Sequence, residues 1–179
     1  MSILKSITKN PDEKFILRCI ELAQKGLSNG EAPFASLITK NDNIIVESIN
    51  GSKSKVSDHA EILVLDEAHK VLGSPNLSSC TLYTICEPCP MCSFMIREYR
   101  ISRVIFSLFS PFMGGYSKWN ILQDQEIVQF KDYFAEPPEV IAGILENKAK
   151  KIFDQTPLWM FGSNSKSGKG NVKINRKIA

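Results

Sequence analysis

Residues 86–92 read "CEPCPMC" and place three thiols and two prolines within seven positions. Four kinds of site use thiols at such close spacing: a disulfide, a redox dithiol, a structural metal site and a catalytic metal site. The surrounding sequence has to distinguish them. The segment follows a run rich in β-branched and aromatic residues and precedes a helical pattern, so we expect it at a strand-to-helix junction.

Size and composition favour one globular domain whose thiols stay reduced. The chain has 179 residues, of which 43% are hydrophobic and 23% charged, which is typical of a domain with its own core. Its first fourteen residues lack the pattern of a signal peptide, and no apolar run is long enough to span a bilayer. We therefore expect a cytoplasmic protein without a membrane partner. An odd number of cysteines, five in all, further disfavours a disulfide framework.

The positive charge of the chain is confined to its C-terminal end. The formal net charge is +3, but residues 163–179 contain five basic residues and no acidic one, which leaves the first 162 residues at −2. We predict one domain over residues 1–162 and a basic, flexible tail over residues 163–179. An arm that binds nucleic acid is the alternative interpretation of this tail.

The pattern of apolar residues predicts an alternation of helices and strands. Helical spacing predicts helices at 12–28, 59–72, 89–99 and 138–153. Runs of β-forming residues predict strands at 33–39, 43–49, 81–85, 103–109 and 127–130, the first two joined as a hairpin. This order indicates an α/β layered domain with a partly parallel sheet.

Cys89 and Cys92 are three residues apart at a predicted helix start, so their side chains project from nearly the same face. The positive end of a helix favours thiolates, and two thiolates on one face suit zinc. The chain has two histidines, and one of them, His59, opens another predicted helix. If the two helix starts meet, three protein ligands leave one position open, which is typical of a catalytic zinc. We expect one Zn²⁺ per chain.

Glu61 lies two residues beyond the predicted ligand His59. Residues two apart point to different sides of a regular helix, so these two can share a pocket only at its first turn. There the carboxylate would act as a general acid–base rather than as a ligand, and partial burial would raise its pKa to suit that work.

The order His59-Ala60-Glu61, then Pro88-Cys89-Pro90-Met91-Cys92, matches the signature of zinc nucleobase deaminases. Over roughly residues 12–155 the chain resembles the cytidine-deaminase-like superfamily, and most closely the branch with guanine deaminases, cytosine deaminases and bacterial tRNA adenosine deaminases. This resemblance implies a three-layer α/β/α fold with a mixed five-stranded sheet, often in a homodimer. It also implies hydrolytic deamination, with zinc and Glu61 as the catalytic pair.

The resemblance further implies how a small nucleobase or nucleoside would be bound. Asn50 matches the asparagine that contacts the polar edge of the base in the family. The expected substrate contacts are Pro33, Phe34, Asn50, Ala60 and Pro88. The cysteine segment is close to that of guanine deaminases, which favours a purine.

Three alternatives remain open from the residues alone. A tRNA adenosine deaminase would use the same chemistry on a flipped-out base, but it needs a basic surface to bind RNA. A zinc-stabilised interaction domain would have no use for Glu61. A redox dithiol of Cys86 and Cys89 would make Cys86 essential and the metal irrelevant.

Overall fold

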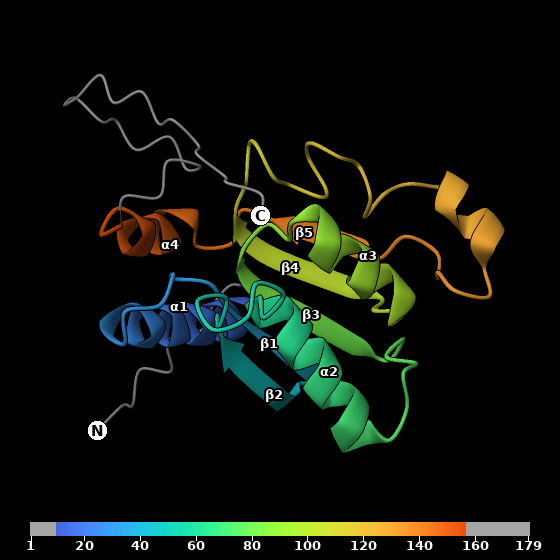
Figure 1. Cartoon of the computed structure of the whole chain (residues 1–179), viewed down its shortest axis with the longest axis horizontal. Helices are drawn as coiled ribbons and strands as arrows, with labels where there is room; N and C mark the ends of the chain where they lie inside the picture. The colour runs from blue at the N-terminus through green and yellow to red at the C-terminus, as the bar shows by residue number, and fades with distance from the viewer. Residues whose placement is uncertain (1–9, 157–179) are drawn as a thin grey trace, which may run out of the picture.

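The computed structural model describes residues 10–156, and a five-stranded sheet lies at its centre (Figure 1). The strands are β1 (Ala35–Lys40), β2 (Asn43–Ile49), β3 (Cys80–Cys86), β4 (Arg103–Leu108) and β5 (Glu139–Ala142). The helices are α1 (Glu13–Ser28), α2 (Ala60–Leu72), α3 (Pro90–Glu98), the 3-10 helix η1 (Glu126–Phe130) and α4 (Glu146–Phe153). The tail predicted at 163–179 lies outside the described residues.

The sheet is mixed, as the resemblance implied. Its strand order is β2-β1-β3-β4-β5, with β1 antiparallel to both β2 and β3, while β3, β4 and β5 run parallel. The β1–β2 hairpin turns through Asn41 and Asp42, whose φ angles of 50° and 58° suit a tight turn between twisted strands. The parallel β3–α3–β4 crossover brings the first turn of α3 to the carboxyl end of β3.

Helices cover both faces of the sheet, which confirms the predicted three layers. On one face α1 and α4 pack against strand residues such as Leu37, Tyr83 and Ile105. On the other face lie α2 and α3 (Figure 1). These helices pack against strand residues that alternate with the first set, including Ile38 and Leu82. Within residues 10–156 no helix has both the length and the apolar character needed to cross a membrane.

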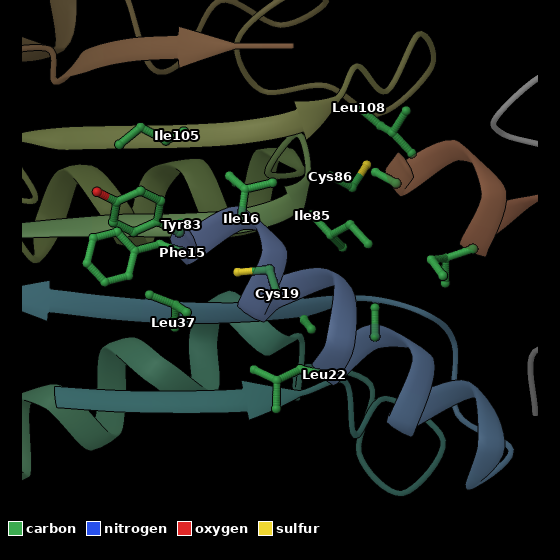
Figure 2. Packing of buried hydrophobic residues seen from close by; sticks show 14 of the residues in the cluster. Phe15, Ile16, Cys19, Leu22, Leu37, Tyr83, Ile85, Cys86, Ile105 and Leu108 are labelled. Carbon is green, nitrogen blue, oxygen red and sulfur yellow. The ribbon is translucent and has the colours of Figure 1, made fainter. Parts of the chain in front are cut away.

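The two apolar clusters give each face of the sheet its own core. Figure 2 shows the cluster beneath α1, where the rings of Phe15 and Tyr83 lie 4.7 Å apart between centroids. Cys19 in this cluster and Cys80 in the other are completely buried, so both act as small apolar residues. Burial on both faces explains why the central strands are nearly continuous apolar runs.

Two of the elements expected from the sequence pattern were wrong. The predicted strand at 127–130 is part of η1, whose first amide is capped by Asp124 at 2.7 Å. The predicted helix at 138–153 is instead β5 followed by α4, with Gly143 (φ 82°) between them. Val140 of β5 pairs with Val104 of β4, and this long-range pairing overrides the local helical spacing.

A buried ion pair joins the start of α1 to the sheet. Asp12 is 5% exposed and accepts hydrogen bonds from the hydroxyl of Tyr83 (2.7 Å) and from two nitrogens of Arg103 (3.1 and 2.9 Å). Burial raises the pKa of Asp12, but the hydrogen bonds from Arg103 and Tyr83 outweigh it and bring the pKa below its usual range. The folded state therefore favours the ionised carboxylate.

Asp12→Asn should lower the free energy of unfolding by about 2 kcal/mol at neutral pH, because it breaks a charge-assisted pair at a buried site. Since the pKa of Asp12 is lower in the folded state, its contribution is complete above the unfolded pKa of about 3.9 and disappears as pH falls through the folded value. Urea unfolding from pH 7 to pH 3 measures this difference. Glu139→Gln is the matched control, because Glu139 pairs with the same Arg103 but is 62% exposed, so it should cost only about 0 to 1 kcal/mol.

Candidate active site

Three chain segments meet at one end of the sheet. β3 ends at Cys86, α3 starts one residue after Cys89, and α2 starts one residue after His59. His59 and Cys89 both have the extended backbone of an N-cap residue, with ψ angles of 147° and 170°. Pro90 occupies the first turn of α3, where its missing N–H costs no hydrogen bond. Both helix starts therefore face the same site.

His59, Cys89 and Cys92 form a group that could hold one metal ion. The two sulfurs are 3.5 Å apart, and each lies 3.5 Å from Nδ1 of His59. Zinc bonds of about 2.3 Å to sulfur and 2.0–2.1 Å to nitrogen at tetrahedral angles require separations of roughly 3.6 to 3.8 Å. The donor types and their spacing thus fit zinc, and a tetrahedron over these three atoms keeps one position for another ligand.

The two thiols of this group have pKa values shifted in opposite directions. Hydrogen bonding from Cys92, together with His59, lowers the pKa of Cys89 to about 4. The same contact with Cys89, and burial, raise the pKa of Cys92 well above its ordinary value. The hydrogen bond to Cys89 also raises the pKa of His59. One thiolate is therefore present before any cation binds, and a divalent cation would displace the second proton.

Glu61 lies on the first turn of α2, next to the three ligand atoms. Its carboxylate is 4% exposed, accepts a hydrogen bond from the hydroxyl of Thr84 at 2.8 Å through Oε1, and has Oε2 3.7 Å from Sγ of Cys92. Burial, and then the negative charge of Cys89, raise the pKa of Glu61. A carboxyl group with a raised pKa beside a metal site can both accept and donate protons near neutral pH.

A cavity of about 320 Å³ opens onto this group. Five of the site residues expected from the sequence line this cavity: Phe34, Asn50, His59, Glu61 and Cys89. Cys92 is buried beneath, while the expected contacts Pro33, Ala60 and Pro88 are buried and are not among the lining residues. Mostly apolar walls with a few convergent polar groups are typical of a small-molecule site.

Asn50 is held at the wall of the cavity. Its side chain is 3% exposed and donates to Oγ of Ser52 at 2.6 Å, while its backbone N–H donates to the carbonyl of Phe34 at 2.9 Å. The first bond fixes the amide group, and the second joins the backbone of Asn50 to that of Phe34, which also lines the cavity. An aromatic face beside a fixed amide suits a planar heterocycle with a polar edge.

Cys86 contributes its thiol to the cavity wall rather than to a dithiol. Burial raises the pKa of Cys86 well above its ordinary value, so the group is a neutral thiol. All five cysteines are free, and the sulfur contacts of Cys89 are with Cys92 and His59. A redox dithiol needs its two sulfurs in contact. Because Cys86 is a neutral thiol and Cys89 contacts Cys92 and His59 instead, this geometry disfavours the redox alternative.

Several lining residues were not among the site residues expected from the sequence: Ser52, Glu87, Ser110 and Met113. Ser110 and Met113 belong to the loop after β4, for which no regular pattern predicts a position. Glu87 lies inside the cysteine segment. The one feature of the sequence that could have drawn attention to it is an acidic residue directly after an apolar strand. Its long-range hydrogen bonds are visible only in the folded chain.

The chain matches a known protein family over more than half of its length. The family model described as "Cytidine and deoxycytidylate deaminase zinc-binding region" matches residues 9–108. His59, Glu61, Cys89 and Cys92 all fall within this range.

Individual relatives extend the similarity beyond the cysteine segment. The chain is 36% identical over 141 residues to a tRNA-specific adenosine deaminase of Bacillus subtilis, covering 76% of this chain and 83% of the relative. It is 42% identical over 98 residues to a guanine deaminase of the same species, covering 53% and 63%. A solved structure from a study of tRNA:A34 deaminases superposes with a TM-score of 0.70 at 25% identity, covering 78% and 98%.

Proposed function

The chain belongs to the cytidine and deoxycytidylate deaminase family of zinc-binding enzymes, and we propose that it removes the amino group of a purine base or nucleoside by hydrolysis, releasing ammonia. One observation carries this proposal. Three zinc-type ligand atoms, each 3.5 Å from the others, and a buried carboxylate share a cavity of about 320 Å³. A site with a structural zinc alone needs neither the carboxylate nor the cavity.

His59, Cys89 and Cys92 would hold the zinc ion. When bound, zinc would lower the pKa of a water molecule, so that this water can act as the nucleophile at neutral pH. Two thiolates and a neutral imidazole balance the charge of a divalent cation, so the site as a whole is nearly neutral. A neutral site suits an uncharged heterocycle better than a phosphate or carboxylate substrate.

Glu61 would move the protons of the reaction. Thr84 holds its Oε1, which leaves Oε2 facing the ligand group at 3.7 Å from Sγ of Cys92. From there the carboxylate can take a proton from the attacking water and deliver it to a ring nitrogen of the substrate. It can then take the second proton from the newly formed hydroxyl group and give it to the amine, which leaves as ammonia while the carbonyl forms. Its raised pKa matches this alternation between acid and base.

The substrate we propose is a free amino-purine or its nucleoside. Phe34 offers an aromatic face and Asn50 a fixed amide at the cavity wall. The segment from Cys86 to Cys92 is close to that of guanine deaminases. Residues 10–156 contain 15 Lys and Arg against 19 Asp and Glu, and this net charge of −4 gives the described surface no excess of phosphate-binding groups.

Adenosine in tRNA is the second candidate substrate. It is favoured by the relatives that match most of the chain, at 36% and 33% identity, because both are tRNA-specific adenosine deaminases. The chemistry at the ligand group would be the same, and the base would have to be flipped into the cavity.

A substrate panel tests the proposal. Protein loaded with one zinc per chain is offered guanine, adenine, cytosine, their nucleosides and a tRNA anticodon stem-loop, and ammonia release is measured. The expected result is turnover of a free purine or nucleoside, with little on the RNA. Turnover of the stem-loop alone would establish the second candidate, and no ammonia from any member of the panel would refute both.

We also propose that the protein acts in the cytoplasm, where its thiol ligands stay reduced.

We further propose that the protein is a homodimer. Large apolar side chains remain exposed on α3 and the loop that follows β4, namely Phe94 (42%), Phe112 (52%) and Trp119 (57%). Such side chains are common at interfaces between subunits. Sedimentation equilibrium should give twice the chain mass of 20.1 kDa; the mass of a single chain would refute the dimer.

A further inference from the structure

Glu87 is a buried carboxylate that the chemistry of the site does not use. It lies between the last residue of β3 and Pro88, and its side chain is 3% exposed. Its backbone N–H donates to the carbonyl of Leu108 at 2.7 Å, which extends the pairing of β3 with β4 by one residue. Among residues 10–156 no cation forms an ion pair with it. A buried charge in such surroundings needs several hydrogen bonds.

All four hydrogen bonds of the Glu87 carboxylate come from one loop, residues 110–117. Oε1 accepts from the backbone N–H of Tyr116 (3.0 Å) and of Ser117 (2.6 Å). Oε2 accepts from the backbone N–H of Ser110 (2.8 Å) and from the hydroxyl of Ser117 (2.9 Å). The carboxylate thus joins both ends of a loop that has no regular secondary structure of its own.

The loop is also closely fitted around this carboxylate. A Cβ atom on Gly114 would lie 2.3–2.4 Å from the carboxylate atoms of Glu87, and one on Gly115 would lie 2.0 Å from Oγ of Ser93. The N–H of Gly115 donates to the carbonyl of Pro88 at 2.8 Å. Glycine at both positions is therefore required by the close approach of the loop to the segment that carries Cys89.

This loop contributes one wall of the substrate cavity. Ser110 and Met113 line the cavity, and so does Glu87 itself. Because both oxygens of Glu87 are occupied by donors of the loop, the carboxylate has little capacity left to act as an acid, a base or a ligand. Within the described residues, no hydrogen bond joins Glu87 to Glu61.

We propose that Glu87 is a positioning residue: it fixes the 110–117 loop as a wall of the cavity and thereby determines how tightly the substrate is bound. The inference rests on the proposed deaminase function of the same site. Since the zinc ligands and Glu61 are held by other contacts, a loosened loop should weaken substrate binding more than it slows the chemical step.

Glu87→Gln tests the inference, because it keeps the size of the side chain but turns one acceptor into a donor that opposes backbone N–H groups. Amide exchange at Ser110, Tyr116 and Ser117 should become at least about tenfold faster. With guanine, or whichever panel base the wild type deaminates fastest, KM should rise about tenfold while kcat stays within about threefold. Zinc content should remain one per chain. Glu98→Gln, an exposed carboxylate at the end of α3, is the matched control and should change none of these.

Gly114→Ala provides a second variant that leaves the carboxylate in place. Its methyl group would push the loop away from Glu87, so it should give the same faster exchange and the same rise in KM. Ser117→Ala removes one donor of four and should raise KM less than about threefold.

Other outcomes overturn the inference. Unchanged exchange in both Glu87→Gln and Gly114→Ala would show that the carboxylate does not hold the loop. Faster exchange with unchanged KM would show that the loop does not shape the cavity, and loss of zinc would assign Glu87 to the support of Cys89 instead. Exchange and zinc content need no substrate, so failure of the inference is distinguishable from a wild type that deaminates nothing.

Discussion

Replacement of Glu61 with glutamine should lower kcat by a factor of about 10³ or more, with zinc still bound at one ion per chain. The neutral amide has nearly the same shape but can neither take a proton from water nor return it to the substrate. Thr84 can still donate to the amide oxygen, as it does to Oε1 at 2.8 Å, so the side chain should keep its place. Ammonia release under saturating substrate and metal analysis of the same sample measure both quantities.

The same substitution should not lower the free energy of unfolding. Burial raises the pKa of Glu61, which means that the folded state disfavours the charged form, and a neutral side chain removes this cost. Glu67→Gln, at an exposed position of the same helix, should leave both kcat and stability unchanged. Residual kcat above about a tenth of the wild-type value would contradict the role of Glu61 as the proton-transfer group.

Cys92→Ser should abolish zinc binding and, with it, activity. The sulfur of Cys92 is completely buried and lies 3.5 Å from both other ligand atoms, and a serine hydroxyl is a poor ligand for zinc. The zinc-dependent part of the free energy of unfolding, about 4 kcal/mol when free zinc is about 1000 times its Kd, should disappear. Urea unfolding with and without added zinc measures this part directly.

Cys86→Ser is the matched control for that experiment. This thiol is also buried but lines the cavity and is not one of the three ligand atoms. The variant should keep its zinc and its zinc-dependent stabilisation, at a cost of about 1 to 2 kcal/mol for burying a hydroxyl. If Cys86→Ser lost activity with zinc intact while Cys92→Ser kept it, the dithiol alternative would replace the deaminase mechanism.

Most of the fold could be predicted from local patterns. The predicted helices near 12–28, 59–72 and 89–99 are present with bounds that differ by at most one residue. The strands of the β1–β2 hairpin and the two central strands were also predicted, since long apolar runs bounded by turn residues leave few alternatives. The errors lie between β4 and α4, where short elements depend on distant partners. There, Arg97 of α3 donates to carbonyls of Ile121, Asp124 and Ala135.

The ligand group was predictable because its residue types are rare in this chain and lie at fixed spacing. His59 and Glu61 share one side of the site because the first is an N-cap residue with extended backbone and the second lies on the first helical turn. The hydrogen bonds that hold residues 110–117 as a wall of the cavity were not predictable. The position of this wall depends on a carboxylate 23 to 30 residues away in the chain, at Glu87.

The sequence alone determined where most helices begin, because a helix start depends on neighbours within a turn or two of the chain. It also predicted the zinc ligands and the proton-carrying carboxylate, through the match of two short segments to a known signature. Only the tertiary structure decided that two helix starts point at one spot, that β5 pairs with β4, and that a glycine loop closes over the end of β3. The physical reason is that strand pairing and buried hydrogen bonds join residues far apart in the chain, and their free energy exists only once those residues are in contact.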